Sequence, residues 1–201
     1  MSGGLDSDSR GSRYVVEVTD GWIVALDIGE FGAGIWWVSK DGSKYRTLAH
    51  ETVAELVKTK VGVMAMTGLD HLMNGHGEVL LIRREDRVGW RAKRLASLGP
   101  SAYAATVAPG GDVLVVTRTS LVRVDLKGNV RVLHKGKWDA FFDTGRNTSS
   151  FFYPNSMTVT PTGEVFIGMR AVVVHLRPLA HGYAEEWLYP TACPETGTNR
   201  R

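Results

Sequence analysis

A fourfold repeat of short apolar segments constrains the fold of this chain most strongly. Residues 101–133 divide into four such segments, at 103–108, 113–118, 121–126 and 130–133, separated by the turns PGGD, TS and KGN. Gly and Asn in these turns readily adopt the positive φ that a tight hairpin requires. The same order of segments and turns returns in residues 14–48, 52–98 and 155–190. The pattern predicts four antiparallel strands per unit; residues 51–60 alone have a helix-like composition, in a segment too short to predict a helix.

The spacing of equivalent segments predicts how the units are arranged. The third segment begins near positions 34, 78, 121 and 172, and the last interval is the longest because residues 137–153 are inserted before the final unit. Four antiparallel strands that recur about every 40 to 45 residues are typical of a β-propeller blade. A two-sheet sandwich also contains many short strands, but it does not require the same turns four times. We therefore predict an all-β fold, a small β-propeller with four recognisable four-stranded blades, or five with one degenerate blade.

A propeller assigns an environment to each segment of a unit. The first segments should line the channel, the second and third should form the packed centre, and the fourth should lie at the rim. Uninterrupted apolar runs at 23–26, 63–66, 113–116 and 165–167 predict second strands that are buried on both faces. Charged residues in the rim segments agree with exposure there: Lys44, Arg46, Arg91, Lys93 and Arg131.

Composition and the chain ends bound the class of protein. Hydrophobic residues make up 43% of the chain and the net charge is +3, which favours a globular domain over a disordered chain. Residues 1–12 and 194–201 are predicted to be loose tails around one domain at 13–193. We expect no membrane association and, because no secretory signal is present, a cytoplasmic location by default. Cys193 is the single cysteine, so no internal disulfide is possible.

A basic cluster occupies residues 83–94, where six Lys and Arg surround Glu85 and Asp86. A nucleic-acid groove usually contains more basic residues with aromatic residues between them, and only Trp90 lies between them here. We therefore interpret this segment as an exposed, solvated strand pair and expect no nucleic-acid partner.

Two segments are similar to known propellers. The segment PNSMTVTPTGEVFIG at 154–168 resembles gluconolactonase-like and senescence-marker-type six-bladed propellers. Residues 108–133 are similar to a blade of that superfamily or of NHL-repeat proteins. The resemblance implies a metal-dependent lactonase or esterase in which Asn155, with Glu30 as an early acid, holds a divalent ion such as Ca²⁺. The chain departs from the family pattern at IGMRAVV, where an aspartate is expected, and its roughly 177 residues between the tails are too few for six blades. A four-bladed ring, a five-bladed ring and a chain that has lost N-terminal blades all fit that length.

Histidines offer little sign of a metal centre. Asp70, His71 and His76 have side chains that bind zinc or nickel, but a polar hairpin loop explains them better. His175, within an apolar segment, is interpreted as a hydrogen-bonded core or channel histidine.

Aromatic residues concentrate in the insertion at 137–153. We predict that they bind a partner, the structural alternative being that they cover the channel or fill a gap between blades; they are Trp138, Phe141, Phe142, Phe151, Phe152 and Tyr153.

Three charged residues hold related places at the ends of second segments, where they should lie near one mouth of the channel. Asp27, Arg118 and Arg170 could there bind a small anion or an acidic side chain of a partner, or pair with one another. The leading hypothesis is a non-catalytic scaffold without cofactor. It would bind a protein partner, as an inhibitor or immunity protein of a bacterium does, or a small ligand, at the face that carries the insertion.

Overall fold

The computed structural model describes residues 12–27, 32–69, 76–136, 138, 154–169 and 172–189. Within these residues sixteen strands form four antiparallel sheets of four strands each, and no helix is present. The all-β prediction is therefore confirmed. Of the predicted tails at 1–12 and 194–201, Ser12 begins the first strand, and the other residues lie outside the described residues. None of the described residues form a helix with the length and apolar character needed to cross a membrane.

Each sheet is built from four strands that are consecutive in the chain and hydrogen-bonded in that order. Sheet 1 contains β1 (Ser12–Val18), β2 (Gly21–Asp27), β3 (Ala33–Ser39) and β4 (Tyr45–Ala49). Sheet 2 contains β5 (Val53–Thr59), β6 (Gly62–Leu69), β7 (His76–Glu85) and β8 (Gly89–Gly99). Sheet 3 contains β9 (Ala102–Val107), β10 (Val113–Thr117), β11 (Ser120–Val124) and β12 (Val130–Lys135). Sheet 4 contains β13 (Pro154–Val159), β14 (Val165–Met169), β15 (Val173–Pro178) and β16 (Tyr183–Leu188).

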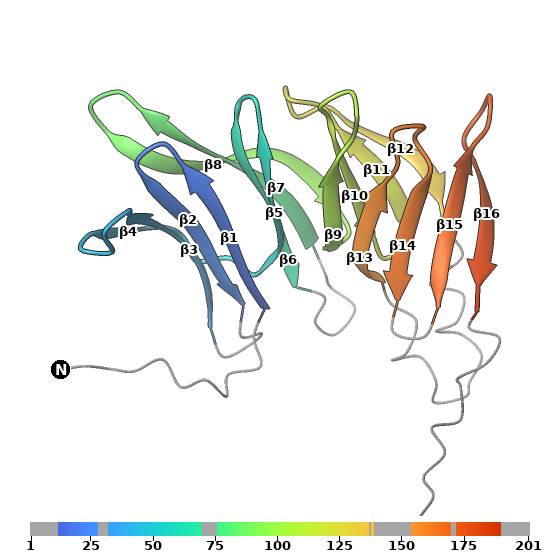
Figure 1. Ribbon diagram of the computed structural model, residues 1–201, viewed down its shortest axis with the longest axis horizontal. Helices are drawn as coiled ribbons and strands as arrows, with labels where there is room; N and C mark the ends of the chain where they lie inside the picture. The colour runs from blue at the N-terminus through green and yellow to red at the C-terminus, as the bar shows by residue number, and fades with distance from the viewer. Residues whose placement is uncertain are drawn as a thin grey trace, which may run out of the picture.

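The four sheets stand side by side in chain order (Figure 1). Their first strands contact one another in succession, β1 with β5, β5 with β9 and β9 with β13, so these strands lie on the inner side of the row. The fourth strands form the outer side, where the charged residues predicted for the rim are exposed. Sheets 1 and 4 occupy opposite ends of the row (Figure 1), so the described residues form an open arc of blades.

The core consists of three apolar layers, one between each pair of neighbouring sheets. Ile23 and Ile35 of sheet 1 pack against sheet 2, Met66 of sheet 2 packs against sheet 3, and Leu121 of sheet 3 packs against sheet 4. Sheets 2 and 3 are covered on both faces, and their second strands are accordingly buried at 63–66 and throughout β10. The prediction of burial on both faces is confirmed for these two sheets.

The two end sheets differ from that prediction. In β2 and β14 buried residues alternate with partly exposed ones, including Val24 and Phe166. Among the described residues, each end sheet is covered by a neighbouring sheet on one face only, which produces this alternation. Sequence composition could not reveal it, because both faces of these strands are apolar.

Turn glycines act as the repeat predicts. Gly111 and Gly163 have φ values of 90° and 87°, in the turns that join β9 to β10 and β13 to β14. In each turn the glycine N–H donates to the carbonyl of a residue three positions earlier, Ala108 or Thr160. These identical turns fix the same hairpin register in sheets 3 and 4. The helix-like segment at 51–60 forms β5, because Val53, Leu56 and Val57 are buried in the core layers.

Candidate binding surfaces

The second strands of the sheets all end at the edge opposite the hairpin turns that precede them. Asp27 ends β2 in sheet 1 and Arg118 follows β10 in sheet 3. These two predicted ligand-binding residues thus lie at the same edge, but sheet 2 stands between their sheets. The related position in sheet 2 is occupied by Thr67, which is buried and donates to the carbonyl of Glu78. Arg170 lies outside the described residues, so the three-residue site stays a prediction.

Trp138 is the residue of the aromatic insertion that the structure describes, and it belongs to the core. Its side chain is 1% exposed, and Nε1 donates to the carbonyl of Thr117 over 3.1 Å. The indole packs into the layer between sheets 3 and 4 and occupies the space that a side chain at Gly136 would need. At this position the alternative prediction holds, in which the aromatic side chain fills a gap between blades. The prediction that Trp138 is exposed and binds a partner is corrected, because its side chain has almost no accessible surface. The other predicted anchors lie outside the described residues: Phe141, Phe142, Phe151, Phe152 and Tyr153.

The residues implied by the lactonase resemblance do not assemble a metal centre in the described part of the chain. Asn155 is exposed on β13, and its Oδ1 accepts a hydrogen bond of 3.1 Å from the Ser156 hydroxyl. Glu30, Asp70 and His71 lie outside the described residues. Among the residues with described positions, no three His, Cys, Asp or Glu side chains gather closely enough to hold a metal ion. A hard divalent ion needs several oxygen ligands, so Asn155 by itself does not fit one.

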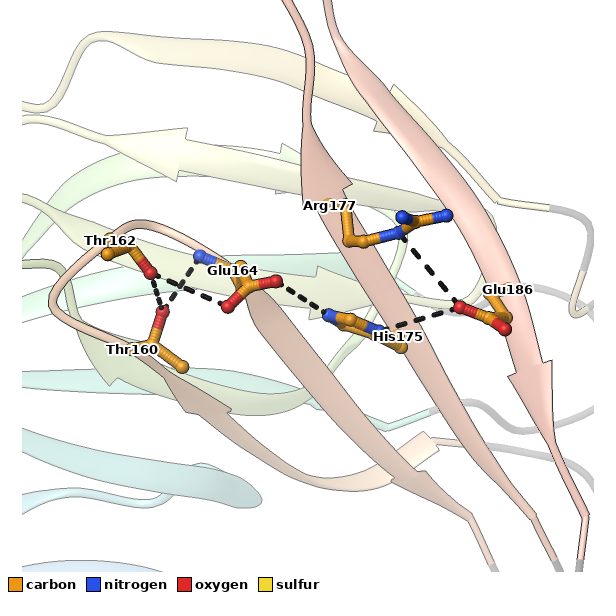
Figure 2. Close-up of polar contacts among 6 residues, drawn as sticks. All are labelled: Thr160, Thr162, Glu164, His175, Arg177 and Glu186. Carbon is orange, nitrogen blue, oxygen red and sulfur yellow. Dashed lines mark hydrogen bonds and ion pairs between the residues drawn. The ribbon is translucent and has the colours of Figure 1, made fainter.

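The outer face of sheet 4, which is the face turned away from sheet 3, carries a polar row centred on His175 (Figure 2). His175 lies opposite Phe166 on one neighbouring strand and Glu186 on the other. Its imidazole stacks on the Phe166 ring with centroids 4.3 Å apart and planes inclined by 6°. Nε2 is 3.2 Å from Glu164 Oε1, and Nδ1 is 3.8 Å from Glu186 Oε2. Both ring nitrogens and one ring face are therefore engaged, which fixes the orientation of the imidazole.

Further contacts extend the row at both ends (Figure 2). Arg177 Nε lies 4.0 Å from Glu186 Oε2. In the β13–β14 turn, the Thr160 hydroxyl contacts that of Thr162 over 2.8 Å and accepts the main-chain N–H of Glu164 over 3.0 Å. His175 was expected to be hydrogen-bonded, and it is; it lies on an outer sheet face, however, and not in a core layer or the channel. These contacts make the outer face of sheet 4 a charged surface.

The outer face of sheet 1, which is the face turned away from sheet 2, is mainly apolar. Directly paired residues of neighbouring strands share a face, so Val15, Val24 and Trp36 form one apolar row across the sheet. Trp22, Val38 and Tyr45 form the next row, which ends in the exposed Glu17 of β1, directly opposite Trp22. Val15 is 59% exposed, Trp22 36% and Tyr45 76%. The other three apolar residues of these rows, Val24, Trp36 and Val38, are half-buried. No sheet of the described residues covers this face.

The sequence contains a signal for this surface in the composition of its first two segments. Segments 14–18 and 22–26 are apolar at nearly every position, as in the doubly covered sheets, although they belong to the unit at one end of the row. An end unit with two apolar faces has one face that no other described sheet covers. Recognising this requires the order of the sheets in space, which the repeat pattern alone does not provide.

The chain is similar in fold to solved structures of known proteins. No protein-family model matches the chain, and no curated protein matches it. A catalytically inactive virginiamycin B lyase from Staphylococcus aureus, solved with quinupristin, is 15% identical with a TM-score of 0.54, over 92% of this chain and 58% of the lyase. A selenomethionine form of that lyase gives 15% identity and a TM-score of 0.55, over 93% of this chain and 58% of the lyase. A streptogramin B lyase is 11% identical with a TM-score of 0.52, over 90% of this chain and 55% of the lyase.

These similarities establish the fold and no finer relationship. The chain spans between half and two thirds of the length of the lyases that it matches. Its four antiparallel sheets follow one another as propeller blades do, and the neighbours are propellers of the same general kind as the gluconolactonase and NHL types. The protein is therefore an all-β protein with the β-propeller fold.

Proposed function

We propose that this protein is a non-catalytic scaffold that binds a protein partner through the outer face of sheet 1. The observation that carries the proposal is the exposed apolar surface of Val15, Trp22 and Tyr45. Together these side chains expose on the order of 300 Å² of surface, if a large side chain has about 150–250 Å² in total. Patches of roughly this size are the largest that monomers usually expose, and they often have a function.

The partner would contact this face as sheet 2 contacts the opposite face. Ile23, Ala25 and Ile35 on that opposite face are buried by side chains of sheet 2. A β-sheet of the partner could pack on the outer face with similar geometry, since stacked sheets generally lie about 10 Å apart. Tryptophan and tyrosine are the residue types that contribute most to binding at such interfaces. Such binding would include inhibition of the partner, as by an inhibitor or immunity protein.

The charges of sheet 4 favour a different protein over a second copy of this chain. In a head-to-tail pairing that continues the order of blades, the second copy would offer its charged row, including Glu164, His175 and Glu186. Packing that row on Val15 and Trp22 would remove charges from water against mainly apolar side chains, which is unfavourable. We therefore expect the partner to present a sheet face that is itself apolar.

An enzymatic function is the second candidate, and the fold similarity is compatible with it. The neighbours are lyases, and one was solved with quinupristin. At 15% identity their chemistry does not transfer to this chain through the fold. Incubation with quinupristin, followed by mass spectrometry, separates the two functions: our proposal expects the compound to remain intact, and its turnover would show that the chain is an enzyme.

Partner binding is tested by affinity capture with matched variants. Val15→Glu places a charge on the outer face of sheet 1, and Val132→Glu places the same charge on β12, where Val132 is 52% exposed. Both variants should melt within about 2 °C of the parent, since surface substitutions usually change stability by less than 0.5 kcal/mol. We expect a captured protein that, once purified, binds the parent and Val132→Glu in 1:1 stoichiometry and binds Val15→Glu at least tenfold more weakly.

Two results would overturn this proposal. One is a partner that binds the parent and Val15→Glu equally well, because its site must then lie elsewhere. The other is self-association of the parent in light scattering that Val15→Glu abolishes, because a second copy would then cover the face.

A further inference from the structure

A surface pocket lies between sheets 1 and 2, at the edge where the β1–β2 and β5–β6 hairpins turn. Its volume is about 330 Å³. Residues from three places in the chain line it: the β1–β2 turn, the β5–β6 turn, and the facing ends of β7 and β8. The size is within the range of small-molecule sites, which usually begin near 300 Å³.

The lining of this pocket is cationic. Lys58, Lys60, Arg83 and Arg84 contribute to it, and no Asp or Glu does. Thr19, Thr59 and a main-chain glycine at 62 supply the other polar groups, and valines together with Trp90 supply apolar walls. Lys58 and Arg83 are separated by 25 positions in the chain, and the β5–β6–β7 meander brings them to one pocket.

Nearby carboxylates compensate this charge only in part. Asp20 lies 3.1 Å from Arg84, but its carboxylate also accepts the indole N–H groups of Trp37 and Trp90 over 3.2 and 2.8 Å. Glu85 contacts Arg83 weakly, at 3.9 Å, and contacts Lys93 at 2.7 Å. Hydrogen bonding to Lys93, the main cause, lowers the pKa of Glu85, so this carboxylate is ionised and engaged outside the pocket.

Neither lysine forms an ion pair with an acidic side chain in the described part of the chain. Lys58 Nζ donates to the main-chain carbonyl of Glu17 over 2.9 Å, which leaves two donors and the full charge. Lys60 extends toward the neighbouring Gly111 turn of sheet 3, where its Cε and Nζ lie within 4 Å of the place that a β-carbon on that glycine would take. Four cationic side chains line the pocket and Asp20 pairs with one of them, Arg84, so the lining favours a ligand with two negative charges.

We propose that this pocket binds a small phosphomonoester. A phosphate dianion would neutralise the lysines, and the guanidinium groups of Arg83 and Arg84 have the planar donor geometry that suits phosphate oxygens. Trp90 and the valines provide an apolar wall for the organic group of the ester. A monocarboxylate would leave half of the lysine charge uncompensated. The site is independent of the outer face of sheet 1, and either assignment stands without the other.

In the experiment the full chain is titrated with phenyl phosphate, and binding is measured by calorimetry and by tryptophan fluorescence. We expect a single site with a Kd below about 1 mM that weakens as salt is added. Inorganic phosphate should bind more weakly because it does not reach the apolar wall, and phenol should not bind because it has no charge.

Matched variants locate the site. Lys58→Met and Arg83→Gln remove lining charges, and Lys127→Met and Arg131→Gln remove exposed charges of sheet 3 that lie outside the pocket. Lys60→Met is the second lysine variant, because Lys58 also bonds to the main chain. Each lining variant should weaken phenyl phosphate at least tenfold with an unchanged melting temperature, and each control should change Kd less than twofold. Absence of binding below about 10 mM, or equal weakening by the control variants, would overturn the assignment.

Discussion

Trp138→Ala tests whether the insertion supplies the core, as the structure indicates, or a surface. The indole is 1% exposed and fills the layer between sheets 3 and 4 with Leu121, Ile167 and Val174. An aromatic side chain of about 150–250 Å², at about 25 cal/mol per Å², corresponds to roughly 4–6 kcal/mol of burial. Alanine keeps part of that contact and the cavity partly closes, so the expected loss is about 3–5 kcal/mol.

Trp138→Phe separates packing from hydrogen bonding. Phenylalanine retains most of the ring but lacks the N–H that donates to the Thr117 carbonyl. We expect a smaller loss, about 1–3 kcal/mol, because a buried acceptor is left without its donor.

Urea denaturation and thermal melting followed by circular dichroism measure both variants. In a chain of this length, 3–5 kcal/mol corresponds to a fall in Tm of roughly 6–20 °C. Trp22→Ala is the matched control, since Trp22 lies on the uncovered face of sheet 1 and is 36% exposed. A Trp138→Ala protein that melts with the parent, or a Trp22→Ala protein that loses as much stability, would refute the assignment of Trp138 to the core.

Three further predictions concern stability. Asp20→Asn should lower the free energy of unfolding, measured by urea denaturation, by about 1–3 kcal/mol, because it disturbs the acceptor of two indole N–H groups and an arginine. An unchanged midpoint would show that Asp20 does not join sheets 1 and 2. Gly77→Ala should cost about 1–3 kcal/mol because its methyl group would collide with the Pro100 carbonyl, and Gly110→Ala, which meets open space, should melt with the parent. Burial raises the pKa of Glu55, so the charged form of this side chain opposes folding above that pKa. Glu55→Gln should therefore raise Tm at pH 7, and the gain should vanish near pH 4. A gain that is independent of pH would contradict the charge argument.

An exposed turn should show the opposite dependence on pH. Hydrogen bonds from the Asn129 side chain and main chain lower the pKa of Asp125, which also accepts the main-chain N–H of Lys127. The ionised form therefore stabilises the fold above the ordinary pKa of aspartate, and this contribution is lost as pH falls through the lowered value. Asp125→Asn should lower Tm at pH 7 and differ less from the parent near pH 3; equal differences at both values would exclude this cause.

The strands and the turns between them could be predicted from the sequence. Third strands were expected near 34, 78, 121 and 172, and they begin at Ala33, His76, Ser120 and Val173. The agreement is close because strand length and hairpin register depend on local chemistry: β-branched residues within the strands and glycine at positive φ in most of the described hairpin turns. Burial of the second strands in sheets 2 and 3 also followed from their uninterrupted apolar composition.

The candidate surfaces required the tertiary structure. Trp138 was expected on a surface and lies in a core layer, because composition shows that a side chain is apolar and not whether another sheet covers it. The same reason explains Val15 and Trp22, whose strands resemble those of the central sheets but whose outer face has no neighbour in the described chain. Sequence thus determined the blades through local periodicity. Only the packing of blade on blade decided which apolar faces are core, which are open to a partner, and which distant lysines and arginines share a pocket.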